Sequence, residues 1–186
     1  MPQYEPVITD EELLAGFRIP GQQEKFFAIL IRQYQKQIYW FIRRMVLDHD
    51  DANDLTQDVF IRVWENLDRF RGDSHLIYWI YRIATNTTFT FLRVKKRKRA
   101  ERIDEESPLA RKLKAGLTID ADQVQEKLLT AINTLPDRQR AVFQLRYYDE
   151  MPYGEMAKML SLTEGSLKAT YFHAVKKIEK FMTEKD

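Results

Sequence analysis

Residues 152–171, near the end of the chain, constrain its fold more than any other segment. Pro152 has a fixed φ and no N–H to lose, so it suits the start of a short helix. Residues 161–163 then break the helical pattern, and Thr163 can cap a following helix. The apolar residues of that helix recur at spacings of three and four: Leu167, Tyr171, Ala174, Val175 and Ile178. Two short helices joined by a tight turn form the helix-turn-helix pattern, which reads duplex DNA.

A third helix is predicted just before this pair. Pro136 suits the first turn of a helix that runs through Phe143 and Leu145 to about Tyr148. The alternative interpretation is a small bundle of three helices without a DNA-binding role, because apolar helix pairs are common. Features elsewhere in the chain are needed to choose between a DNA-binding helix-turn-helix and such a bundle.

Composition is consistent with an intracellular helical protein. The chain has 186 residues, 44% of them hydrophobic, and no cysteine, so disulfides and thiolate metal sites are excluded. No long apolar run is present and residues 1–4 lack the features of a signal peptide, so we expect a cytoplasmic protein without membrane insertion. The formal charge is only +2, so a nucleic-acid partner requires a local basic patch.

Such a patch lies near the middle of the chain. Residues 93–99 contain six Lys or Arg side chains, at the end of an aromatic-rich helix. A solvated charge run is the alternative interpretation, but the placement before a helix-turn-helix favours contact with phosphates. Periodicity is weak over 95–124, which predicts a linker between two small helical domains in an all-α fold. The predicted divisions are listed here: N-terminal segment 1–22, first domain 23–94, linker 95–124 and second domain 125–186.

Two long helices are predicted in the first domain. An apolar stripe indicates a helix from about Gln23 to Leu47, and residues 50–53 supply acidic groups that can cap the next one. On that next helix the following residues share one face: Asp54, Gln57, Asp58 and Ile61. Taken alone, this mostly polar face is best explained by solvation.

A turn-rich loop, residues 70–75, follows and leads into an aromatic helix over 78–92. Aromatic rings beside Arg and Asn can stack on unstacked bases, but they can equally form a core. Trp79 keeps the spacing of a buried stripe, so we assign it mainly to packing. We assign base contact to the loop and to Asn86.

The segment D-D-A-N-D-L-T-Q-D-V-F-I-R-V-W-E-N-L-D-R-F-R-G-D-S from Asp50, with Y-W-I-Y-R-I-A-T-N-T from Tyr78, resembles region 2 of bacterial sigma factors of the extracytoplasmic-function (ECF) group. The segment L-P-D-R-Q-R-A-V-F-Q-L-R-Y-Y from Leu135, with the helix-turn-helix behind it, resembles their region 4. The two similarities occur in the family's order and spacing. They imply a sigma factor that binds core RNA polymerase and directs promoter recognition, DNA melting and transcription initiation.

The resemblance also implies roles for particular residues. Five would dock on the clamp helices of core RNA polymerase: Asp54, Gln57, Asp58, Ile61 and Trp64. Seven would bind the melted non-template strand at the minus-ten element and hold a flipped base: Arg44, Phe70, Arg71, Ser74, Arg82, Ile83 and Asn86. Arg43 and the run from Arg93 would add salt-dependent backbone contacts.

The helix from Glu164 to about Lys180 resembles the reader of the minus-thirty-five element. Its DNA-facing residues would be Glu164, Ser166, Lys168, Ala169, Thr170, His173, Lys176 and Lys177. Many relatives have arginine at the positions of Thr170 and His173, so bidentate guanine contacts are reduced in this chain. An anti-sigma factor is a further expected partner, because proteins of this group are commonly held inactive by one.

Nothing in the sequence supports catalysis. The three histidines, His49, His75 and His173, lack metal-ligand spacing, and no phosphate-binding glycine loop or nucleophile motif is present. We therefore expect no cofactor, no metal and no enzymatic activity. Two alternatives remain at this point: a stand-alone helix-turn-helix regulator that binds an operator without polymerase, and a helical interaction protein with no DNA role.

Overall fold

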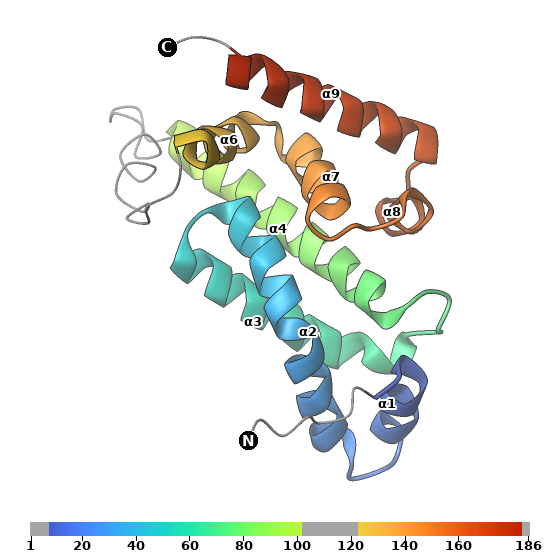
Figure 1. The fold of residues 1–186 in the computed structure, drawn as a ribbon. Coiled ribbons are helices and arrows are strands. Elements are labelled where there is room, and N and C mark those ends of the chain that lie inside the picture. Colours follow the sequence, from blue (N-terminus) through green and yellow to red (C-terminus); the bar gives the residue numbers. More distant parts are fainter. Residues whose placement is uncertain (1–7, 102–122, 184–186) are drawn as a thin grey trace. The chain divides into compact units, whose positions relative to one another are not determined.

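A computed structural model describes residues 8–101 and 123–183, and its regular elements over these ranges are all helices (Figure 1). The all-α prediction is therefore confirmed. The helices are α1 (Asp10–Phe17), α2 (Gln23–Val46), α3 (His49–Asn66), a 3-10 turn η1 (Leu67–Arg69), α4 (Leu76–Glu101), α6 (Gln123–Thr134), α7 (Asp137–Tyr147), α8 (Tyr153–Leu160) and α9 (Glu164–Thr183). Two compact units are present, Met1–Thr88 and Phe89–Asp186, so the boundary falls within α4.

The proposed linker, 95–124, is only partly described. Helix α4 continues to Glu101, so residues 95–101, predicted as the start of the linker, are helical. The basic run, residues 93–99, lies in the same helix. Residues 102–122 of that linker lie outside the described residues, as do residues 1–7 of the N-terminal segment and 184–186 of the second domain.

In the first unit, α2 and α3 lie side by side, as Figure 1 shows. Helix α2 ends at Val46, and the C-cap residue Leu47, with a φ of 65°, turns the chain back. The cap of α3 is Asp48, two residues before the first of the acidic residues predicted for that role; its carboxylate accepts from the backbone N–H groups of Asp50 and Asp51 at 3.1 and 3.2 Å. A carboxylate at this end also interacts favourably with the helix dipole.

The core of this unit is formed by the apolar stripes of α2, α3 and the first turns of α4. The rings of Phe41 and Tyr81 meet edge to face, with centroids 5.4 Å apart, and join α2 to α4. The side chains buried around them include Leu30, Ile38, Ile42, Leu55, Val59, Val63 and Ile80. These are the positions that helical periodicity predicts.

Helix α1 was not anticipated in the predicted N-terminal segment. It begins with a capping box: Thr9 Oγ1 accepts from the Glu12 backbone N–H at 3.2 Å, and Glu12 Oε2 accepts from the Thr9 N–H at 2.8 Å. It packs against α2, and Gly16 lies so close to Phe26 that a Cβ at this glycine would overlap the ring. The pattern Thr-x-x-Glu was the signal available in the sequence.

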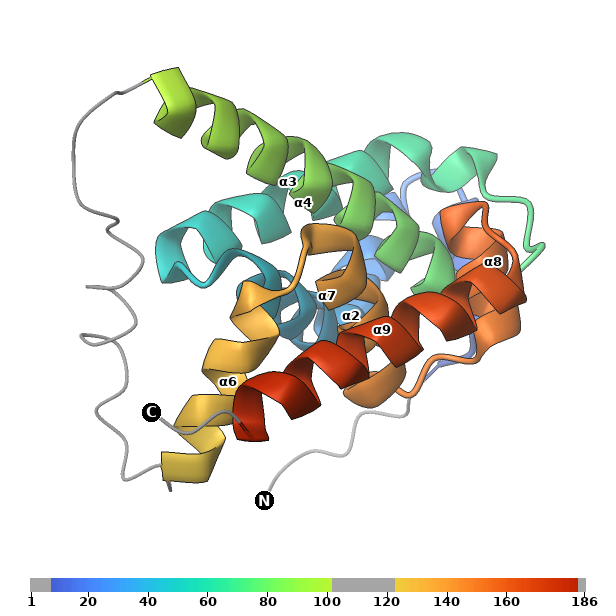
Figure 2. The same cartoon turned by 90° about the horizontal axis from the view of Figure 1, so that it is seen from above.

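The second unit contains the helix-turn-helix. Helix α8 ends at Leu160, and its C-cap residue Ser161, with a φ of 55°, makes the turn. Thr163 Oγ1 then accepts from the Ser166 N–H at 3.1 Å to cap α9. The predicted turn and cap are confirmed. Helix α6 lies beside α9 (Figure 2). A core cluster joins α6, α7 and α9, with Ala131, Ile132, Leu135, Phe143, Ala174 and Ile178 buried in it.

Candidate functional site

An exposed face of α3 combines acidic and apolar side chains. Asp54, Gln57 and Asp58 are exposed, and Ile61 continues the same face with 56% of its surface accessible. Large apolar side chains on a surface mark interaction sites when they lie together. The structure thus brings the predicted polymerase-binding residues onto one accessible face.

Trp64 closes this face at the end of α3. The residue is 39% exposed, and its ring packs edge to face against Phe17 of α1 and Phe27 of α2, at centroid distances of 5.4 and 4.9 Å. Two such contacts fix the orientation of the indole. Trp64 therefore presents a rigid apolar edge, with little side-chain entropy left to lose on binding a partner.

The loop after η1 has an open backbone. Gly72 has a φ of 79° and space around its Cα, and Arg71 is exposed while Ser74 is half-buried. Phe70 differs from its neighbours, because its ring is buried and packs against Trp79 with centroids 5.2 Å apart. Because its ring is buried, Phe70 fixes the start of the loop by packing and leaves no exposed ring face on which a base could stack. Trp79 is half-buried, in agreement with its assignment to packing.

Three predicted strand-binding residues follow on one side of α4. Arg82 and Asn86 are exposed at i and i+4, and Ile83 between them is half-buried. Arg44, on α2, is also half-buried. Arg82 and Asn86 thus form an accessible pair after the loop, and the helix continues into exposed Lys and Arg residues up to Lys98.

Along α9 the predicted DNA-reading residues are accessible, while Leu167, Ala174 and Ile178 face the core. Thr170 is the half-buried member, and its hydroxyl donates to the Ser166 carbonyl at 2.7 Å, which orients it along the helix. The exposed members are Glu164, Ser166, Lys168, Ala169, His173, Lys176 and Lys177.

Exposed ion pairs hold two of these lysines. Lys168 Nζ lies 3.4 Å from Glu164 Oε2, and Lys176 Nζ lies 2.8 Å from Glu179 Oε2. Pairs this exposed contribute little to stability and can exchange for phosphate contacts at low cost. The helix keeps its basic groups available in this way.

A ring with two cations beside it was missed by the sequence analysis. Tyr153 of α8 has the Arg146 guanidinium 5.1 Å and the Lys168 ammonium 5.6 Å from its centroid, so it links α7, α8 and α9. Tyr171 lies 6.4 Å from the same ring, and burial, followed by the nearby Tyr153, raises the pKa of Tyr171. No local spacing brings Arg146, Tyr153 and Lys168 together, so a sequence pattern offers no signal for this cluster.

Over the described ranges, no group of His, Asp or Glu side chains is arranged to hold a metal ion. Among the helices that the structure describes, none has the length and apolar character needed to cross a bilayer. The surfaces described above are made of exposed charges, amides and apolar edges. The chain joins a helix-turn-helix to a second helical unit, which places it in the class of helical DNA-binding proteins.

Comparison with known proteins specifies the family. Residues 30–98 match Sigma-70 region 2, and residues 125–178 match Sigma-70 region 4. The ECF RNA polymerase sigma-E factor of Escherichia coli (strain K12) is 28% identical over 182 residues, covering 92% of this chain and 93% of that protein. The RNA polymerase sigma-H factor of Pseudomonas aeruginosa is 27% identical over 180 residues, covering 92% of each. The chain belongs to the ECF group of sigma factors, which bind core RNA polymerase and direct promoter recognition and transcription initiation.

Solved structures share the fold. The sigma factor RpoE of Bartonella quintana, in complex with the anti-sigma factor NepR, aligns with a TM-score of 0.69 at 21% identity, covering 87% of this chain and 99% of that one. CnrH, in complex with the cytosolic domain of CnrY, aligns with a TM-score of 0.68 at 21% identity, covering 93% and 96%. The stand-alone regulator, the alternative from the sequence, is not favoured by these findings.

Proposed function

We propose that the exposed face of α3 is the polymerase-docking surface of this sigma factor. The observation that carries the proposal is the placement of Ile61 and Trp64, two exposed apolar side chains, beside the acidic Asp54 and Asp58. Apolar anchors surrounded by polar groups are the usual composition of a binding hot spot. The carboxylates would select a basic partner surface and speed its association.

The loop 70–75 and the adjoining face of α4 are proposed to receive the melted minus-ten strand. Gly72 leaves the loop backbone open, and Arg82 and Asn86 are accessible next to it. A flipped base costs a few kcal/mol of unstacking, which hydrogen bonds from Asn86 and contact with Ile83 would offset. The basic end of α4 would hold the strand's phosphates without reading their sequence.

Helix α9 is proposed to lie in the major groove of the minus-thirty-five element. Its N-terminal exposed residues, Ser166, Lys168 and Ala169, are at the end of the helix that contacts bases in helix-turn-helix proteins. Lys176 and Lys177 lie further along and would contact phosphates. With Thr170 and His173 in place of arginines, the preference for particular bases would be weaker than a bidentate arginine provides.

The remaining assignments follow from family membership. This chain would act in the cytoplasm, where the polymerase works, and would perform no chemistry itself, with strand synthesis left to the polymerase. One structural neighbour, the sigma factor RpoE of Bartonella quintana, was solved with the anti-sigma factor NepR, which supports an anti-sigma protein as a partner of this chain. The divisions 1–22, 23–94, 95–124 and 125–186 are proposed as its functional segments.

The test is a pull-down against bacterial core RNA polymerase, followed by run-off transcription on fragmented genomic DNA. Wild-type protein should bind saturably and produce new start sites, which also deliver the promoter sequence. The double variant Asp54→Lys and Asp58→Lys should lose polymerase binding with nearly unchanged thermal stability, because both carboxylates are exposed. Full binding by the double variant would remove the docking role of α3, and binding of duplex DNA without polymerase would favour a stand-alone regulator.

A further inference from the structure

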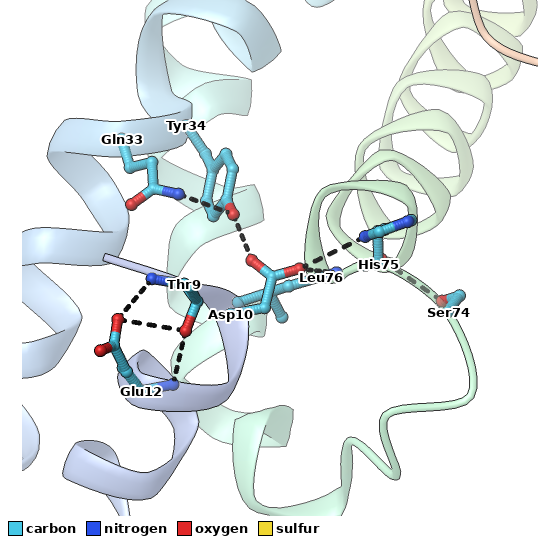
Figure 3. Close-up of polar contacts among 8 residues, drawn as sticks. All are labelled: Thr9, Asp10, Glu12, Gln33, Tyr34, Ser74, His75 and Leu76. Carbon is cyan, nitrogen blue, oxygen red and sulfur yellow. Dashed lines mark hydrogen bonds and ion pairs between the residues drawn. The ribbon is translucent and has the colours of Figure 1, made fainter. Parts of the chain in front are cut away.

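Asp10 of α1 bonds directly to the end of the loop that precedes α4. Its Oδ2 accepts a hydrogen bond from the Leu76 backbone N–H at 2.9 Å, and His75 Nδ1 lies 3.9 Å from the same oxygen (Figure 3). Leu76 is the first residue of α4, and the first N–H groups of a helix have no partner within it. A side chain from α1 thus caps a helix that begins 66 residues later in the chain.

Electrostatics strengthen this bond. The carboxylate faces the N-terminal end of α4, where the helix dipole favours negative charge. The Asp10 side chain is only 24% exposed, so water screens the interaction less than it does at a surface pair. A charge-assisted hydrogen bond of this kind is about twice as strong as one between neutral groups.

The other oxygen of Asp10 is held by α2. The Tyr34 hydroxyl donates to Asp10 Oδ1, and Gln33 Nε2 donates to the Tyr34 oxygen at 2.9 Å (Figure 3). Burial, and then the hydrogen bond to Asp10, raise the pKa of Tyr34, so its hydroxyl stays protonated and keeps donating. Both carboxylate oxygens are therefore fixed, one by α2 and one by α4.

The chain around Asp10 limits its freedom further. Thr9 and Glu12 close the capping box that starts α1, so the backbone at Asp10 is set by two reciprocal hydrogen bonds. At the other end of α1, an Arg18 guanidinium nitrogen lies 3.5 Å from the Phe70 carbonyl oxygen, at the start of the loop. Helix α1 and its C-cap residue thus contact the chain at the first residue of the loop, Phe70, and at Leu76, just after its last.

We propose that Asp10 is a positioning residue for promoter opening: it holds the loop 70–75 and the start of α4 in the shape that receives the flipped base. The proposal rests on the base-receiving role of the loop given above. Asp10 itself would not touch DNA. It lies before residue 30, outside the segment matched by Sigma-70 region 2.

The first test measures the loop in the free, full-length protein by amide hydrogen exchange. In Asp10→Ala the Leu76 amide should exchange at least about tenfold faster, equivalent to about 1.4 kcal/mol, while amides in α9 keep their wild-type rates. Glu11→Ala, an exposed neighbour on the same helix, is the matched control and should leave Leu76 protected. An unchanged Leu76 rate in Asp10→Ala would overturn the proposal.

The second test measures base capture by the holoenzyme. Forked duplexes carrying the promoter from the run-off experiment are made with the captured base present or replaced by an abasic site. Asp10→Ala should weaken binding to the intact fork about tenfold and leave binding to the abasic fork unchanged, because a misplaced loop matters only when a base has to enter it. Equal losses on both forks would mean that Asp10 is merely structural.

Further variants keep the test decisive if Asp10→Ala does not fold. Tyr34→Phe removes the donor to Asp10 but keeps the ring, and should shift both readouts in the same direction by a smaller factor. Asp10→Asn keeps an acceptor oxygen and should partly restore base capture. If wild-type holoenzyme binds intact and abasic forks equally, the base-receiving role of the loop fails, and this proposal with it, even where Leu76 is protected.

Discussion

Ile61 is the most direct test of the docking surface, because its side chain is large, apolar and more than half exposed. Truncating a fully buried isoleucine to alanine costs about 2–5 kcal/mol of stability, but exposed substitutions usually stay within about 0.5 kcal/mol. Alanine also favours the helix by a few tenths of a kcal/mol. We therefore expect the free energy of unfolding of Ile61→Ala to differ from wild type by less than about 1 kcal/mol.

Polymerase affinity should respond much more strongly. If Ile61 is an anchor that becomes buried on docking, its truncation should cost about 2 kcal/mol, which is about a 30-fold increase in Kd. Fluorescence anisotropy of labelled protein titrated with core polymerase measures the Kd, and thermal unfolding measures stability.

Ile19→Ala is the matched control for this experiment. Ile19 lies between α1 and α2, has 51% of its surface exposed and belongs to none of the three proposed interfaces. Its truncation should leave the Kd within about twofold of wild type. Equal Kd values for Ile61→Ala and Ile19→Ala would refute the docking role of the α3 face.

Three further predictions concern the same unit. Asn86→Ala should reduce open-complex formation, measured by permanganate reactivity, more than closed-complex binding, and equal losses would make Asn86 structural. Gly16→Ala should lower the free energy of unfolding by about 1 kcal/mol in chemical denaturation, because overlap with Phe26 outweighs the gain in helix propensity; a stabilised variant would contradict this. Above about pH 10, Tyr34 loses its proton in the unfolded protein and keeps it in the folded one, because its pKa is raised by folding. The free energy of unfolding of wild type should therefore fall with pH more steeply than that of Tyr34→Phe, by up to about 1.4 kcal/mol per pH unit. Parallel plots of stability against pH for the two proteins would exclude this role of Tyr34.

The candidate surfaces on α3 and α9 could be predicted from the sequence because each lies on a single helix. Asp54, Asp58 and Ile61 share a face through helical periodicity alone, and their exposure agrees with that expectation. Phe70 shows the limit of this approach. The family resemblance implies a DNA-binding role for this residue, but spacing along the chain gave no indication that Trp79 packs against its buried ring.

The sequence by itself determined the features that depend on neighbouring residues. These are the apolar stripes of α2 and α3, the turn at Ser161, the cap at Thr163 and the division into helical units. These features depend on residues within a few positions of one another, and such short-range patterns can be read directly from a sequence. The Thr9 capping box belongs to the same kind of pattern, although it was overlooked.

Only the tertiary structure decided which distant residues meet. Asp10 and Leu76 are separated by 66 positions, and their hydrogen bond exists because α1 packs on α2 and brings a carboxylate to the start of α4. The cations around Tyr153 likewise come from different helices. Contacts of this kind depend on how whole helices pack, and periodicity specifies the buried face of a helix without specifying the partner that covers it.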